Sequence, residues 1–212
     1  MQSEPPRHRA DVVEAAAGSA GWRTAGGARL PAMLILSVLA QLESPGPVFY
    51  RQERVGLDGR RFRIFKFRTM QMNNHENAHR EAAARWFAGH PNGTGYKSLD
   101  DPRITRVGRF LRRFSLDELP QLLNVLRGEM SLVGPRPALP CELELYLPPY
   151  FERQRVPSGI TGLWQVSGRD RVSAATMMEI DLRSVREASL WLDLKILGRT
   201  GAAVFSSALG TD

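Results

Sequence analysis

The feature that most constrains the fold is the one strongly apolar stretch of the chain, PAMLILSVLAQL at residues 31–42. A helix needs about 20 apolar residues to cross a bilayer, whereas stretches of about 10–14 are typical of core helices and of re-entrant or interfacial segments. Residues 1–29 lack clear periodicity, so we expect a disordered or atypical segment there. Residues 1–22 also lack the apolar core of a secretory signal. We therefore expect no bilayer-spanning helix.

The charge balance points to an anionic partner. The 212 residues are one domain's worth of chain and carry a net charge of +7, with a pI of about 10.3. Nucleic acid, an anionic membrane surface and phosphorylated substrates all suit this balance. The single cysteine, Cys141, excludes an internal disulfide and suits a reducing compartment.

A β-hairpin is the clearest local element. Residues 47–55 (PVFYRQERV) and 60–70 (RRFRIFKFRTM) favour strand, and GLDG between them supplies the turn. The second strand alternates apolar and cationic side chains, but the period slips at Phe65 and Lys66. Composition alone favours a solvated cationic face over a strand that binds phosphate or lipid headgroups.

Helical patterns dominate the rest of the chain. Residues 73–89 have the composition of a polar helix, and from residue 104 helices alternate with short extended pieces. The last helix is expected over residues 189–205. Together with the hairpin, these patterns predict a single α+β domain that is mainly helical.

A cluster of arginines falls in the segment DPRITRVGRFLRR at residues 101–113. If the segment is helical, spacings of three place most of them near one face, where like charges repel. An anionic group should offset them, either the nearby carboxylates or a bound phosphate. The arginines are Arg103, Arg106, Arg109, Arg112 and Arg113.

Two adjacent carboxylates, Asp117 and Glu118, follow this cluster. The motif SLDE fits a capping box with Ser115 as N-cap, which by itself explains the acids. A helix from there would carry an apolar stripe, and Pro120 would distort its first turn. The leucines of the stripe are Leu116, Leu119, Leu123 and Leu126.

The motifs on either side of the two acids indicate a role for them beyond helix capping. SLVGPRP follows the acids and holds Arg136 between two prolines, and a rigidly placed guanidinium suits bidentate phosphate recognition. Carboxylates beside arginines stay ionised, so one can bind Mg²⁺ or attack phosphorus. These ingredients favour phosphoryl chemistry over nucleic-acid binding.

With these motifs the sequence resembles the bacterial sugar transferases, the monotopic polyprenyl-phosphate phosphoglycosyl transferases. The resemblance extends over residues 31 to about 200 and is highly specific. The matching stretches are SPGPVFYRQERVG, FRIFKFRTM, DPRITRVGRFLRRFSLDELPQLLNVLRGEMSLVGPRP, PSGITGLWQVSGR and SLWLDLKIL.

The resemblance implies transfer of a phosphosugar from a UDP-sugar to polyprenyl (undecaprenyl) phosphate, with release of UMP, as the first step of exopolysaccharide or glycan assembly. It implies that Asp117 is the nucleophile that forms a covalent phosphosugar intermediate, that Glu118 assists, and that both bind Mg²⁺. Arg112 and Arg136 would hold phosphate. Lys66 lies in a matching motif and is a further candidate for phosphate binding.

The resemblance also implies attachment to the cytoplasmic face of the bacterial inner membrane through a re-entrant helix. Here only its second arm, residues 30–43, is apolar, and GWRTAGGARL occupies the place of the first arm. We expect a partial re-entrant or interfacial helix there, followed by the catalytic domain at residues 44–205.

The sequence also allows three other interpretations. HENAH matches the zinc protease motif, with His75 and His79 as ligands and Glu76 as base, but its flanks are polar and favour a solvent-exposed helix. A nucleic-acid-binding module suits the charge, but the sequence lacks a zinc finger, an RNA-recognition motif and a stacking platform. A relative that keeps the fold but does not reach its lipid substrate stays open.

Overall fold

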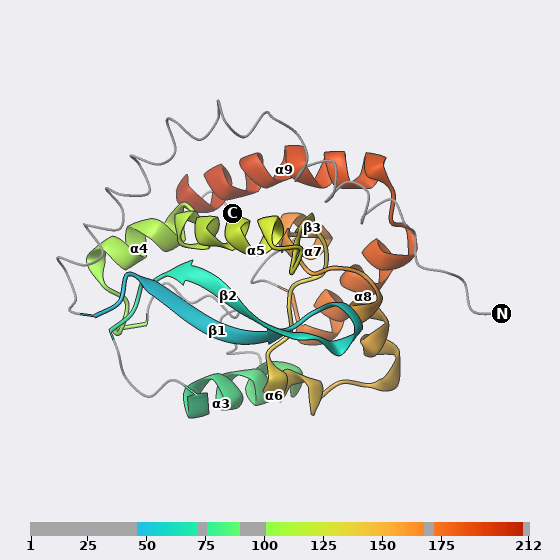
Figure 1. Cartoon of the computed structure of the whole chain (residues 1–212), viewed down its shortest axis with the longest axis horizontal. Helices are drawn as coiled ribbons and strands as arrows, with labels where there is room; N and C mark the ends of the chain where they lie inside the picture. Colours follow the sequence, from blue (N-terminus) through green and yellow to red (C-terminus); the bar gives the residue numbers. More distant parts are fainter. Residues whose placement is uncertain (1–45, 72–75, 90–100, 168–171, 210–212) are drawn as a thin grey trace.

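The computed structural model describes residues 46–71, 76–89, 101–167 and 172–209 (Figure 1). The strands are β1 (Phe49–Val55), β2 (Arg61–Phe67), β3 (Ser131–Val133) and β4 (Gly159–Thr161). The α-helices are α3 (Glu76–Phe87), α4 (Arg106–Arg113), α5 (Leu122–Leu126), α6 (Pro140–Leu143), α7 (Leu163–Ser167), α8 (Ala174–Arg186) and α9 (Leu190–Leu209). Three 3₁₀ helices complete the elements: η1 (Leu57–Gly59), η2 (Leu116–Gln121) and η3 (Pro148–Arg155).

The predicted hairpin is confirmed. Strands β1 and β2 pair antiparallel, from Phe49 opposite Phe67 to Val55 opposite Arg61. The period of two persists through the apparent slip, because Ile64 and Lys66 lie on the same face and both line one cavity. Phe65 takes the other face, where the guanidinium groups of Arg51 and Arg127 lie 5.2 and 4.8 Å from its ring centroid.

A second, two-stranded sheet joins the GPRP and GITG motifs. Strands β3 and β4 run parallel, with Ser131 opposite Gly159 and Val133 opposite Thr161. A Cβ on Gly159 would lie 2.1 Å from the backbone nitrogen of Gly134, so this close approach requires glycine. The sheet thereby fixes the start of the loop that carries Arg136.

The main core lies between α3, α7 and α8, to one side of the hairpin. Its buried residues are Trp86, Ala138, Tyr146, Trp164, Ala174, Met177 and Met178. A smaller cluster of Ile64, Val125 and Met130 packs β2 against α5. The hairpin therefore sits between two cores, with α4, α5 and α9 on one side and α3 and α6 on the other (Figure 1).

The segment after the arginine cluster differs from the predicted helix. Ser115 has φ 53 and its side chain makes no capping hydrogen bond, so the capping box is not formed. Pro120 lies inside a 3₁₀ helix, η2, and the α-helix begins only at Leu122. Since proline lacks an N–H donor, the chain enters α5 through the tighter turn.

The expected apolar stripe does not lie on one continuous helix, because Leu116 and Leu119 lie in η2 and Leu123 and Leu126 lie in α5. Leu123 and Leu126 of α5 are 42% and 48% exposed, whereas Asn124 between them is buried. Asn124 accepts a hydrogen bond from the Phe65 N–H at 3.1 Å and donates to the Arg63 carbonyl at 2.8 Å. Asn124 thus pairs with the edge of β2 that does not face β1, next to the buried apolar side chain of Val125.

The predicted arginine face does not form as a unit. Arg103 precedes α4 and is bound by Asp101, and three other arginines of the cluster, Arg106, Arg109 and Arg113, are exposed. Only Arg112 lines the cavity. The helix begins at Thr105, whose side chain caps the Gly108 N–H at 2.9 Å.

The helix predicted at residues 73–89 is present as α3, but it is not fully solvated. Ala83 and Trp86 are buried, because one side of α3 packs against α6 and α8. His75 lies outside the described residues, as do the side chains of Glu76 and His79, so the zinc motif has no structural description.

The two N-terminal predictions, over residues 1–29 and 30–43, also lie outside the described residues. Within the described ranges, no helix combines the length and apolar character that a bilayer crossing requires.

Candidate active site

One cavity brings together all five residues singled out from the sequence. Its volume is about 700 Å³, and it opens between the hairpin, η2, the loop at residues 134–139 and the start of α7. The five residues reach it from four separate parts of the chain. They are Lys66 on β2, Arg112 on α4, Asp117 and Glu118 on η2, and Arg136 on the loop.

The two acids lie on the same short helix but in different surroundings. Asp117 is buried, as are Pro120 and Gln121 on the same side of η2. Glu118 is half-buried and pairs with Lys66, whose Nζ lies 3.2 Å from its Oε1. Because η2 contacts β2, the tight 3₁₀ turn sets both carboxylates at the wall of the cavity.

Arg112 is fixed by a close approach of α4 to the end of the hairpin. A Cβ on Gly108 would lie 2.2 Å from the Thr69 carbonyl oxygen, so glycine allows the helix to pack there. The Arg112 Nε donates to Thr69 Oγ1 at 2.9 Å. Burial lowers the pKa of Arg112, and the negative charge of Asp117 opposes that shift. An arginine remains cationic at neutral pH in either case.

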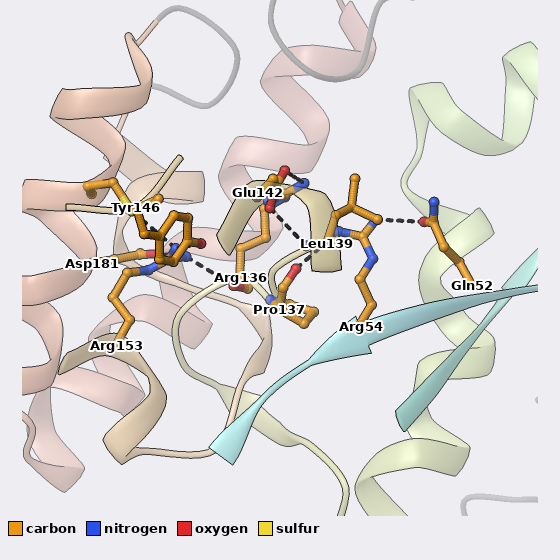
Figure 2. A network of polar contacts seen from close by, with 10 residues as sticks. Gln52, Arg54, Arg136, Pro137, Leu139, Glu142, Tyr146, Arg153 and Asp181 are labelled. Atoms are coloured by element: carbon orange, nitrogen blue, oxygen red, sulfur yellow. Dashed lines mark hydrogen bonds and ion pairs between the residues drawn. The ribbon is translucent and has the colours of Figure 1, made fainter. Parts of the chain in front are cut away.

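Arg136 lies on the loop flank of the cavity, at residues 134–139, and a buried carboxylate holds it. Its Nη1 and Nη2 each donate at 3.0 Å to one carboxylate oxygen of Glu142, which is fully buried (Figure 2). The side chain of Arg136 still reaches the cavity wall. A guanidinium carries five N–H donors, more than this pair uses.

Several residues of the cavity were not singled out from the sequence. Thr69 lies in the FRTM motif and Gln121 follows the acid pair, so both had a signal in the matching motifs. Trp164 and Gln165 of α7 also line the cavity. Glu142 had no signal, because its importance depends on where the loop at residues 134–139 places Arg136.

The donor set fits a magnesium ion. Magnesium is commonly bound by one or two carboxylates together with waters and substrate phosphates, without a full protein cage. Asp117 and Glu118 provide two carboxylates in one cavity. Nowhere in the described ranges do three or more His, Cys, Asp or Glu side chains gather as a metal cage would require. The arrangement therefore suits a metal held jointly with a phosphorylated substrate.

The cavity combines a negative pair with six cationic side chains and an apolar part of the lining. The cations are Arg51, Arg54, Lys66, Arg68, Arg112 and Arg136. Lys66, Arg112 and Arg136 can together neutralise a diphosphate, and a carboxylate lies among them. The aromatic and aliphatic part of the lining comes from residues such as Val48, Phe49, Tyr50, Ile160 and Trp164. The site is suited to an anionic substrate that also carries less polar groups.

Comparison with known proteins agrees with these features. The sequence profile described as "Bacterial sugar transferase" matches residues 24–207. A UDP-galactose-lipid carrier transferase of Erwinia amylovora is 46% identical over 81% of this chain and 36% of its own length. The exopolysaccharide production protein ExoY of Sinorhizobium fredii is 45% identical over 82% of this chain and 77% of its own.

A third relative is the undecaprenyl-phosphate galactose phosphotransferase of Salmonella typhimurium, which is 46% identical over 75% of this chain and 33% of its own length. The chain thus spans about a third of two of these relatives and about three quarters of the other. The resemblance inferred from the motifs is confirmed: the chain belongs to the bacterial sugar transferase family, a family of enzymes.

Proposed function

We propose that this chain transfers a sugar 1-phosphate from a UDP-sugar to polyprenyl phosphate, with release of UMP, as the first step of exopolysaccharide or glycan assembly. The observation that carries the proposal is the convergence of Asp117 and Glu118 with cationic side chains in one cavity, among them Lys66, Arg112 and Arg136. The names of the relatives, which include a UDP-galactose-lipid carrier transferase and an undecaprenyl-phosphate galactose phosphotransferase, supply the substrate classes.

In the first step, a carboxylate oxygen of Asp117 attacks the phosphorus that carries the sugar. A new P–O bond to Asp117 forms, the P–O bond to UMP breaks, and UMP leaves with the electron pair. Arg112 and Arg136 flank the cavity and stabilise the charge on the phosphoryl oxygens. Burial of Asp117 shields the intermediate from water.

In the second step, a phosphate oxygen of the polyprenyl phosphate attacks the same phosphorus. The bond to Asp117 breaks, the carboxylate is regenerated, and the product is a polyprenyl diphosphate sugar. Glu118 assists, and Lys66 beside it neutralises the second anionic substrate. Because two substrates use one covalent intermediate in turn, ping-pong kinetics should follow.

Magnesium fits this proposal as the cofactor. Asp117 and Glu118 would hold it, and when bound it would neutralise the diphosphate and favour departure of UMP.

We place the protein at the cytoplasmic face of the bacterial inner membrane, where its lipid substrate is found.

Exposed apolar side chains on α4, α5 and α9 support contact with lipid, as does the expected interfacial segment at residues 30–43. These helices lie on one side of the hairpin, and α4 contacts α9 (Figure 1). The exposed apolar residues include Phe110, Leu123, Leu126, Trp191, Leu194 and Leu197, and the exposed cations between them include Arg106, Arg109, Lys195 and Arg199. Cations interleaved with apolar side chains suit an anionic lipid surface.

The reaction is tested by UMP release. Membrane fractions that contain the wild type or Asp117→Asn are supplied with Mg²⁺, polyprenyl phosphate and a panel of UDP-sugars. We expect release with at least one sugar from the wild type and none above background from the variant. Failure with every sugar, from protein that does not reach the membrane fraction, would favour the reading of an inactive relative.

A further inference from the structure

The backbone of the loop at residues 134–139 is held by two buried arginines from distant elements (Figure 2). Arg54 of β1 donates from Nη1 to the Pro137 carbonyl oxygen at 3.0 Å. Arg153 of η3 donates from Nη2 to the Arg136 carbonyl oxygen at 3.0 Å. Two successive carbonyl groups of the loop are therefore fixed by charged donors, which form stronger hydrogen bonds than neutral ones.

Arg153 is itself anchored in the core. Its Nη2 also donates to Asp181 of α8 at 2.6 Å, and its Nη1 donates to the Tyr146 hydroxyl at 2.5 Å. Asp181 and Arg153 are both buried. The loop is thus tied through Arg153 to α8, which packs away from the cavity.

Glu142 fixes the side chain of Arg136. Its carboxylate accepts both Nη groups of Arg136 at 3.0 Å and the Leu139 N–H at 2.9 Å. Burial alone would raise the pKa of Glu142, but the charge and hydrogen bonds of Arg136 hold that pKa below its ordinary range. Glu142 is therefore ionised at neutral pH, and it does not line the cavity itself.

We propose that Glu142 is a positioning residue for phosphate recognition: it holds the Arg136 guanidinium in the orientation in which that group meets the diphosphate of the nucleotide sugar. The inference rests on the proposed function, because it takes Arg136 to contact the diphosphate. A free arginine side chain samples many rotamers, and ordering it on binding weakens affinity. In the folded protein Glu142 already orders the Arg136 side chain, so the binding step does not have to.

A second effect of Glu142 acts in the opposite direction. Its negative charge lies next to Arg136 and weakens the attraction of that arginine for an anion. If this charge effect were the larger of the two, removing the charge of Glu142 would tighten diphosphate binding. If the ordering of the Arg136 side chain is the larger effect, removing the charge would weaken diphosphate binding. Both Nη groups of Arg136 are engaged end-on by one buried carboxylate, so we expect positioning to dominate.

The test is a double-mutant cycle on the full chain with UDP as the probe. Binding of UDP in the presence of Mg²⁺ is measured by calorimetry for the wild type, Glu142→Gln, Arg136→Ala and the double variant. Glu142→Gln should weaken binding about three- to tenfold, the cost of ordering one long side chain. In the Arg136→Ala background the same change should have no further effect, because Glu142 acts only through Arg136.

Leu182→Ala is the control for stability. It truncates a buried apolar side chain of α8 that does not line the cavity, which typically costs about 2–5 kcal/mol. It should lower the melting temperature at least as much as Glu142→Gln while changing UDP affinity less. Equal losses of affinity in both variants would mean that Glu142 has only a structural role.

The remaining outcomes also decide the matter. Tighter UDP binding by Glu142→Gln, or effects that multiply in the double variant, would overturn the inference. If the wild type binds UDP but the double-mutant cycle shows no coupling between Glu142 and Arg136, the proposed function stands and only the role of Glu142 is wrong. If the wild type binds no UDP, both the phosphate role of Arg136 and the role of Glu142 are wrong.

Discussion

The two flanks of the cavity hold their charged groups in different ways. On the η2 flank, the Lys66 Nζ lies 3.2 Å from the Glu118 Oε1, and the two side chains are 24% and 20% exposed. On the loop flank, Arg136 and Glu142 make two hydrogen bonds of 3.0 Å, and their side chains are 11% and 1% exposed. The Lys66–Glu118 pair is partly exposed to solvent, whereas the Arg136–Glu142 pair is buried and joined by two hydrogen bonds.

This difference in burial and hydrogen bonding corresponds to the different roles that we propose for the two flanks. Groups beside the proposed nucleophile must accept a change of charge when P–O bonds form and break, so a partly solvated pair suits them. A phosphate clamp is most effective when its geometry is set in advance. We therefore expect geometry to matter more on the loop flank and charge to matter more on the η2 flank.

The largest effect is expected from Asp117→Asn, which removes the proposed nucleophile from the η2 flank. UMP release should fall by about 10⁴-fold or more, because an amide cannot form the covalent intermediate. The melting temperature should change by only a few degrees, since the substitution preserves shape. Substantial UMP release from the folded variant would remove Asp117 from the mechanism.

Arg136→Lys should give the next largest effect. Lysine keeps the charge but cannot form the fork that both Nη groups make with Glu142. Hydrogen bonds to charged groups are worth about 1.5–3 kcal/mol, so kcat/KM should fall about 10- to 100-fold. Steady-state kinetics of UMP release provide the measurement, and a variant with wild-type kcat/KM would show that charge alone is sufficient on this flank.

Lys66 provides the matched comparison on the other flank. Lys66→Met should lower kcat/KM about tenfold and Lys66→Arg should restore most of it, because this site needs a charge more than a fixed geometry. The free energy of unfolding should change by less than about 1 kcal/mol, since the pair with Glu118 is partly exposed. If Lys66→Arg is as impaired as Lys66→Met, the contrast between the flanks is wrong.

The smallest effect concerns the segment that leads into α4. The hydrogen bonds from Arg103 lower the pKa of Asp101 from 3.8 to about 2. A carboxyl group with a lowered pKa in the folded state stabilises the fold above its unfolded pKa, and this contribution disappears as the pH falls through the folded pKa. Asp101→Asn should cost about 1 kcal/mol at pH 7, a figure discounted for solvent screening.

This difference should vanish between about pH 4 and pH 2, and urea unfolding at several pH values would measure it. Glu187→Gln is the control, because Glu187 pairs with Arg183 on an exposed face of α8 and should contribute little. A loss of stability that persists at pH 2 would show that Asp101 acts through its shape and not its charge.

The hairpin and the residues that meet in the cavity could be singled out from the sequence because their signals are local. Alternating side chains and a turn motif define the strands, and Lys66, Arg112, Asp117, Glu118 and Arg136 all lie in motifs of the family. In the sequence Lys66 interrupts the alternation of apolar and cationic side chains in the second strand. In the structure it keeps the period of two, because its side chain lines the cavity on the same face as Ile64.

The failures share a physical cause, which is that burial depends on partners far along the chain. The four leucines after Ser115 were expected to form one apolar stripe, but they are divided between η2 and α5, and in α5 Asn124 pairs with the edge of β2. Glu142 carried no signal because its function depends on the path of the loop, which is fixed by Arg54 and Arg153 from distant segments. Local propensity does not contain such contacts.

The covalent step at Asp117 is tested most directly by mass spectrometry. The full chain is incubated with Mg²⁺ and the UDP-sugar that supports UMP release, but without polyprenyl phosphate, and is then digested. We expect one sugar phosphate on the peptide that contains Asp117, its absence in Asp117→Asn, and its disappearance when polyprenyl phosphate is added. UMP release that requires both substrates at once, with no adduct on that peptide, would contradict the covalent mechanism and indicate direct transfer.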